Sequence, residues 1–201
     1  ANGDIYESEW MIKKRKHNIE FNYDNQTYRE LKRMAENKET GIAIVRIPKR
    51  ELALAAIEIF KKLGKRVFVR EWNMSNPISN IDEYFGKCPP GWLKICVVQQ
   101  KARMGNSIPT EYVKLVYEYQ PKAHIANIAQ SLAGRCCGHG KKDHHVKVYS
   151  HLTQLKAYSL FEQKRFDEFY TFCLEHKLKV SNRSKVESQF TEIESGSFKI
   201  S

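Results

Sequence analysis

Apolar runs and amphipathic stretches alternate along the middle of the chain. Runs rich in β-branched residues, which are typical of buried strands, occur at 41–47, 65–72, 92–98, 112–119 and 145–151. Stretches in which apolar residues recur every three or four positions, which predicts helices, occur at 27–37, 50–64, 76–87 and 122–134. This alternation with short connectors predicts an α/β fold, in which a mostly parallel sheet is covered by helices on both faces.

The same pattern divides the chain into four parts. We expect an N-terminal arm with a short helix at 1–40, an α/β lobe at 41–151, a helical extension at 152–178 and a polar tail at 179–201. The basic cluster KKRK at 13–16 is typical of a solvated arm. The aromatic residues of the extension are expected to pack against the lobe, with a partner interface as the alternative; they are Phe161, Phe166, Phe169, Tyr170 and Phe172.

Composition narrows the classes of partner. The 201 residues include 34 Lys and Arg against 23 Asp and Glu, which gives a net charge of +11. Such a balance favours a polyanion, with nucleic acid ahead of an anionic membrane. No apolar run approaches the roughly 18 residues of a membrane-spanning helix. The five cysteines are an odd number in a chain too large to need disulfides, which predicts a reducing compartment, the cytoplasm or the nucleus.

The stretch AQSLAGRCCGHGKK at 129–142 concentrates residues that carry chemistry. It is not a phosphate loop, because five residues rather than four separate Gly134 from Gly140 and no hydroxyl residue follows Lys141. A zinc site is an alternative, although adjacent cysteines do not match a zinc-finger spacing. The residues that could contribute to it are Cys136, Cys137, His139, His144, His145, Cys173 and His176.

A third interpretation of this stretch places an arginine against a nucleotide. Gln130 lies on a predicted helix and is followed shortly by Gly134 and Arg135. Glycine permits close approach of the backbone, and the planar guanidinium suits the charge that develops on a phosphoryl group in transfer. On this interpretation Arg135 is an arginine finger that reaches a γ-phosphate held by other residues.

The order of these segments resembles the second RecA-like lobe of superfamily two helicases. The loop MGNSIP at 104–109 fits motif V of that family, and QSLAGRCCG at 130–138 fits the core of motif VI. The resemblance covers 41–151 and implies a RecA-like fold for this lobe. It implies ATP and Mg²⁺ as cofactors and a nucleic-acid motor as the function.

The resemblance also implies roles for individual residues. Arg135 would contact the γ-phosphate, Gln130 would position it, Gly105 would let the motif V backbone approach the nucleotide, and Ser107 would stand near the ribose. Backbone contacts to single-stranded or duplex nucleic acid, with DNA favoured, are expected after strand ends. The residues expected to make them are Lys49, Arg50, Asn73, Lys101, Arg103 and Asn106. Trp72 would stack on a base or, as is more usual for an aromatic residue that closes a strand, join the core.

The sequence departs from the family pattern in several places. Gly138 stands where a second arginine is usual, and Ser107 stands where motif V usually has an acid. These changes favour a divergent motor of viral or phage type. The phosphate loop and the Asp-Glu pair of the first lobe are not found in the sequence, so we expect no ATP hydrolysis by this chain alone, no metal ligands of its own and a first RecA-like lobe as partner. The rival hypotheses are a non-catalytic nucleic-acid-binding module of RecA-like fold and a zinc-binding nucleic-acid protein.

Overall fold

The computed structural model describes residues 3–99, 108–129, 132 and 145–180. The chain divides into two compact units. An α/β unit comprises Ala1–Tyr119 and Ser131–Ser150, and a helical unit comprises Gln120–Gln130 and His151–Ser201.

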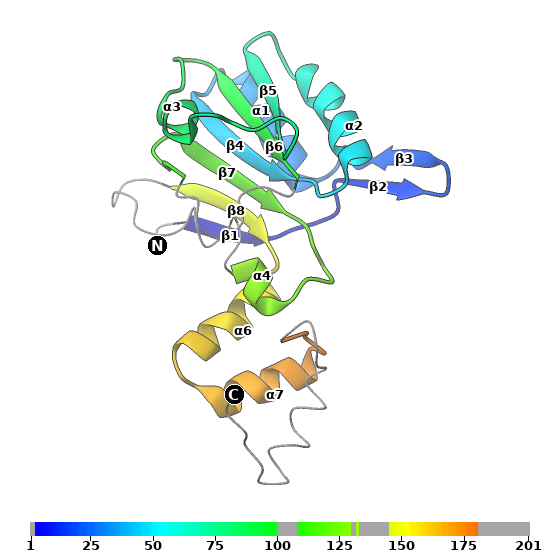
Figure 1. Ribbon diagram of the computed structural model, residues 1–201, viewed down its shortest axis with the longest axis vertical. Helices are drawn as coiled ribbons and strands as arrows, with labels where there is room; N and C mark the ends of the chain where they lie inside the picture. The colour runs from blue at the N-terminus through cyan, green and yellow to red at the C-terminus, as the bar shows by residue number, and fades with distance from the viewer. Residues whose placement is uncertain (1–2, 100–107, 130–131, 133–144, 181–201) are drawn as a thin grey trace. The chain divides into compact units, whose positions relative to one another are not determined.

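The α/β unit contains a six-stranded sheet in which all strands are parallel (Figure 1). The strand order is β1-β8-β7-β4-β6-β5. The strands are β1 (Gly3–Glu7), β4 (Gly41–Arg46), β5 (Val67–Trp72), β6 (Leu93–Val98), β7 (Val113–Glu118) and β8 (Val146–Ser150). The predicted α/β class with a parallel sheet is confirmed, and the sheet is consistent with a RecA-like fold.

Helices cover both faces of this sheet. Helices α1 (Gln26–Glu36) and α2 (Arg50–Lys61) pack on the face that carries Ala43 and Val45. The short helix α3 (Ile81–Gly86) packs on the other face, where the rings of Phe85 and Trp72 are 5.8 Å apart. Because successive side chains of a strand point to opposite faces, the near-continuous apolar runs of the central strands supply both packed layers.

Residues 3–25 are not the solvated arm that the sequence predicts. Residues Gly3–Glu7 form the edge strand β1, which pairs in parallel with β8, and the ring of Tyr6 stacks 5.2 Å from that of Tyr149. The chain then forms an antiparallel hairpin of β2 (Ile12–Arg15) and β3 (Asn18–Phe21). An edge strand has only one neighbour and needs few apolar residues, which is why GDIYE gives no strong strand pattern.

The helical unit contains α4 (Ile125–Ala129), α6 (Leu152–Glu162) and α7 (Phe166–Glu175). Its core is built from all three helices and consists of Ile125, Ala157, Leu160, Phe169 and Cys173. The sequence assigns the 122–134 helix to the lobe, whereas α4 belongs to this unit. The imidazole Nε2 of His151 accepts a hydrogen bond of 2.7 Å from the backbone N–H of Gln120. This bond joins the first residues of the two chain segments that form the unit.

Helix α1 is tied to the sheet by an ion pair whose effect depends on pH. Glu30 accepts a hydrogen bond of 2.7 Å from Lys147 on β8 and one of 2.8 Å from Arg33. The hydrogen bond from Arg33, together with Lys147, outweighs burial and lowers the pKa of Glu30 to about 2. Because this value lies below the ordinary 4.5, ionised Glu30 stabilises the fold above about pH 4.5, and the contribution is lost as the pH falls through about 2.

We therefore expect Glu30→Gln to lower the free energy of unfolding by about 1 kcal/mol at pH 7, the value being modest because solvent screens the pair. The difference from the unmodified chain should shrink steadily between pH 5 and pH 2 in urea titrations. Glu36→Gln, on the exposed side of the same helix, is the matched control and should show no such trend. A difference for Glu30→Gln that does not change with pH would contradict the assignment.

Candidate functional site at the carboxyl edge of the sheet

The carboxyl ends of β4 and β7 define the most informative position in the α/β unit. These strands are neighbours, but the chain leaves β4 for β5 on one side of the sheet and leaves β7 for β8 on the other side. Parallel sheets bind ligands at such a switch point, outside the carboxyl ends of the two strands. The connections after β4, β6 and β7 all begin at this edge.

A buried ion pair lies at this switch point. Arg46 and Glu118 are the last residues of β4 and β7 and are register partners. Arg46 Nε is 3.3 Å from Glu118 Oε1, and the two side chains are only 11% and 1% exposed. Because the transfer of two charges out of water costs several kcal/mol per ion, such a pair is weak evidence for stability alone. Its position favours a role in organising the edge.

Polar residues continue along the edge from β7 to β8 and β1. Ser150 ends β8 and Ser8 follows β1, and both are buried. The backbone N–H of Ser8 donates a hydrogen bond of 2.8 Å to the carbonyl of Ser150. Among the described residues, neither hydroxyl has a hydrogen-bond partner. Buried polar atoms are usually paired, so these hydroxyls add to the unusual polarity of this edge.

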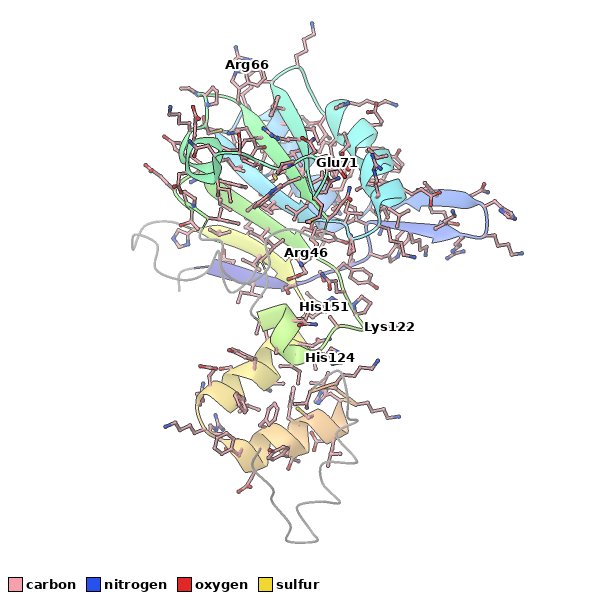
Figure 2. All side chains as sticks on the ribbon, in the orientation of Figure 1. Arg46, Arg66, Glu71, Lys122, His124 and His151 are labelled. Carbon is pink, nitrogen blue, oxygen red and sulfur yellow. The ribbon has the colours of Figure 1, made fainter. Side chains whose placement is uncertain are left out.

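A second polar group occupies the opposite side of the edge, at β5 and β6. Glu71 accepts hydrogen bonds from the side-chain amides of Asn73, at 2.7 Å, and Gln99. Gln99 directly follows β6, is 7% exposed, and donates its backbone N–H to Trp72. It is the last described residue before the predicted motif V loop and fixes the base of that connection. Figure 2 shows Glu71 and Arg46 toward the carboxyl end of the strands, with Arg66 at the opposite end.

Asn73 and Trp72 are both buried, so their side chains are not placed to contact a ligand at the surface. Asn73 is 6% exposed, and its Oδ1 accepts the N–H of Asn76 at 2.7 Å while its Nδ2 binds Glu71. The predicted contact of Asn73 with a nucleic-acid backbone therefore does not fit, because the amide already closes its own loop. Trp72 is 2% exposed and packs on Phe85. It belongs to the core and is not available to stack on a base.

Lys49 and Arg50 lie where a ligand of the edge would meet them. Both are exposed and open helix α2 directly after β4 and Pro48. The side chain of the N-cap residue, Lys49, makes no capping hydrogen bond to the first turn. The two cations therefore stand beside the switch point, as expected from their place in the sequence, and their contact with nucleic acid stays a prediction.

The remaining candidate residues of the motif V and motif VI segments lie outside the described residues. They are Gln130, Arg135, Gly105, Ser107, Lys101, Arg103 and Asn106. The roles that the resemblance implies for them stay predictions.

Most of the candidate zinc ligands, Cys136, Cys137, His139 and His144, also lie outside the described part of the chain. Cys173 is fully buried in the helical unit, and burial raises the pKa of its thiol to about 11, so the thiolate that zinc requires is disfavoured. His176 is exposed, and its ring stacks 4.0 Å from that of Phe172. No cluster of metal-ligating side chains occurs among the described residues.

Sequence reasoning missed Arg46, Glu118, Ser8 and Ser150. Arg46 and Glu118 each end a strongly apolar run, GIAIVR and VKLVYE. The sequence signal that could have identified these two residues was therefore a charged residue at the end of a buried strand. The sequence did not reveal that the two strands are neighbours, and for Ser8 no local signal existed because β1 itself was not predicted.

Comparison with known proteins gives little beyond this geometry. No known protein family matches the chain. An uncharacterized protein of Acanthamoeba polyphaga mimivirus is 38% identical over 71 residues. That match covers 35% of this chain and 18% of the mimivirus protein, so the chain spans a minor part of its relative's length. Of the helices in the described ranges, none is long and apolar enough to cross a membrane.

Proposed function

We propose that the α/β unit is the second motor lobe of an ATP-dependent nucleic-acid helicase or translocase. One observation carries the proposal: the motif V-like segment at 104–109 follows β6 and the motif VI-like segment at 130–138 lies between β7 and β8, on a parallel sheet of RecA-like type. Both segments thus belong to connections of the strands that flank β4. A likeness of motifs alone would be weaker support, because loops of this composition occur on many folds.

In this proposal a first lobe holds the metal-bound phosphates, and this chain completes the nucleotide site. The carboxylate of Glu118 is engaged by Arg46, and the described residues offer no cluster for Mg²⁺. ATP bound to a first lobe would supply the phosphoanhydride bond whose hydrolysis drives the motor. In this chain Arg135 would stabilise the charge that develops on the γ-phosphate, with Gln130 positioned beside it. Gly105 would let the motif V backbone approach the nucleotide, and Ser107 would stand near the ribose.

Nucleic acid would lie along the same edge. Lys49 and Arg50 are exposed beside the switch point, and Lys101, Arg103 and Asn106 belong to the connection that leaves β6. Contacts of this kind bind phosphates and fix the position of a strand without reading its sequence. Opening and closing of the two lobes around ATP would then move the strand. The net charge of +11 supports a polyanionic partner, with DNA favoured.

The mimivirus relative supports a viral protein that acts in a host cell. Cys88, Cys96 and Cys173 are buried free thiols, which supports a reducing compartment, the cytoplasm or the nucleus.

The proposal is tested by ATP turnover and strand binding measured together. The chain alone should bind a fluorescent single-stranded DNA of 20 nucleotides with an affinity that falls steeply with salt, and should not hydrolyse ATP. A polypeptide that joins it to a first lobe should hydrolyse ATP, and single strands should stimulate turnover. Strand binding with no turnover in the joined polypeptide would favour the non-catalytic module instead. No strand binding at all would reject both.

A further inference from the structure

We infer that the β2–β3 hairpin is a second binding element for the phosphodiester backbone of nucleic acid, continuous with Lys49 and Arg50. The inference rests on the proposed nucleic-acid surface and adds to it a segment, 10–21, that lies before the first strand of the helicase resemblance. The hairpin belongs with the predicted contacts because the fold places it beside the first turn of α2, next to Lys49 and Arg50.

The chain brings the hairpin along the carboxyl edge of the sheet. The hydroxyl of Tyr117, near the end of β7, donates a hydrogen bond of 2.7 Å to the carbonyl of Glu9. Met11 is 1% exposed, and Phe21 packs against the core beneath α2, where its ring lies 6.3 Å from that of Phe60. The base of the hairpin is thus fixed to the unit, and in Figure 1 its far end extends beyond the sheet beside α2.

An ion pair places the hairpin against the first turn of α2. Lys14 Nζ lies 3.0 Å from both carboxylate oxygens of Glu51. Glu51 directly follows Lys49 and Arg50, the two exposed cations beside the switch point. The basic residues of the hairpin and those after β4 therefore belong to one surface, although they are far apart in the sequence.

The hairpin presents its positive charge outward. Lys13 and Arg15 flank Glu20 of the opposite strand, at 3.9 Å and 3.2 Å, and the side chain of Arg15 is 65% exposed. Lys16 is exposed in the turn, with a φ of 49°. The hairpin together with residues 49–51 contains six lysines and arginines and two glutamates. This excess of positive charge is complementary to a phosphate backbone.

An aromatic ring lies among these charges. Lys13 Nζ is 3.6 Å from the centre of the Trp10 ring. The Trp10 carbonyl accepts hydrogen bonds of 3.2 Å from the side-chain amides of Asn22 and Asn25, and Asn25 also caps α1. The backbone that carries the ring is therefore tied down by two side-chain hydrogen bonds. Cations interleaved with an aromatic ring are the combination with which proteins bind nucleic-acid strands without sequence preference.

The test removes three charges from the hairpin and three from a matched surface. The hairpin variant is Lys14→Gln, Arg15→Gln and Lys16→Asn, the last chosen because asparagine tolerates a positive φ. The control is Lys62→Gln, Lys65→Gln and Arg66→Gln. All three residues are exposed and lie between the end of α2 and the start of β5, and Figure 2 shows Arg66 at this amino end of the strand. Binding to single-stranded DNA of 20 nucleotides and to a 20-base-pair duplex is measured by fluorescence anisotropy at several salt concentrations.

We expect the hairpin variant to bind about tenfold or more weakly near 0.1 M salt, and its slope of log affinity against log salt to be shallower by about 2 for single strands. The control should stay within about twofold. A hairpin variant that matches the control would overturn the inference and leave the proposed function intact. An unmodified chain that binds neither DNA would remove the proposed function itself.

Two further measurements keep the test decisive. Glu20→Gln removes the carboxylate between Lys13 and Arg15 and should tighten DNA binding by a few-fold, a gain that misfolding cannot imitate. Vesicles that contain phosphatidylserine provide the competing polyanion. Binding to these vesicles through the hairpin, without binding to DNA, would assign the surface to a membrane and overturn the inference.

Discussion

Replacement of Arg135 by alanine is expected to reduce nucleic-acid-stimulated ATP turnover by about three to five orders of magnitude in a polypeptide that joins this chain to a first lobe. The motif VI-like segment has Gly138 where the family usually has its second arginine, so no second guanidinium in that segment can substitute. The planar, permanently charged guanidinium stabilises the charge that spreads over the transferred phosphoryl group. The effect should appear in kcat, because this charge develops in the transition state.

Steady-state turnover with saturating single-stranded DNA checks this prediction. Arg135→Lys keeps the charge but loses the fork of donors, so it should recover only a small part of the turnover. Arg66→Ala, at the amino end of β5, removes an exposed arginine far from the site and should leave turnover unchanged. DNA affinity of the Arg135→Ala chain should change little. Turnover within about threefold of the unmodified polypeptide would show that Arg135 is not the arginine finger.

Replacement of Glu118 by alanine is expected to lower the free energy of unfolding of the α/β unit by about 3–5 kcal/mol. The change removes a carboxylate that is 1% exposed and takes a charged partner away from the guanidinium of Arg46, which is 11% exposed. A buried charge that loses a counter-charge keeps its desolvation cost in the folded state while part of the attraction that offset this cost is gone. Because domains are stable by only about 5–15 kcal/mol, this loss should be visible as a large shift of the unfolding midpoint.

Urea unfolding followed by far-ultraviolet circular dichroism measures this loss. Glu83→Ala, an exposed carboxylate 3.8 Å from Lys87, is the matched control and should cost less than about 1 kcal/mol. The double variant Arg46→Met with Glu118→Leu replaces both charges by apolar side chains and should recover most of the stability, since a buried pair is often matched by well-packed apolar residues. A cost below about 1 kcal/mol for Glu118→Ala would mean that the pair is not buried in solution.

Much of the secondary structure follows from local patterns. The runs that became β4 and β6 are continuous and β-branched, and Leu52, Ala56 and Phe60 form the stripe by which α2 packs on them. These patterns depend on neighbours within one turn or one strand, so they can be recognised without knowledge of the fold. The exposed position of Lys49 and Arg50 beside the switch point could be predicted in the same way, because loops that follow buried strands lie at the carboxyl edge of a parallel sheet, where ligands usually bind. Their contact with nucleic acid stays a prediction.

Elements that depend on distant partners escaped this reasoning. β1 has few apolar residues and becomes a strand only because β8, from the far end of the unit, supplies its hydrogen bonds. The sequence predicted a solvated arm in place of the hairpin, because the basic residues of this segment outnumber the apolar residues that anchor it. Asn73 was predicted to contact nucleic acid at the surface, although its amide is hydrogen-bonded to Glu71 and Asn76.

The sequence by itself determined the central strands and most of the helices, that the sheet is mostly parallel, and that the chain carries an excess of positive charge; the motif V-like and motif VI-like segments remain a resemblance. Only the tertiary structure decided that β4 and β7 are neighbours, that Arg46 meets Glu118 between them, and that the hairpin lies against α2. The reason is physical: periodicity records which face of a segment is buried, whereas strand order and ion pairs arise from contacts between segments that no local pattern encodes.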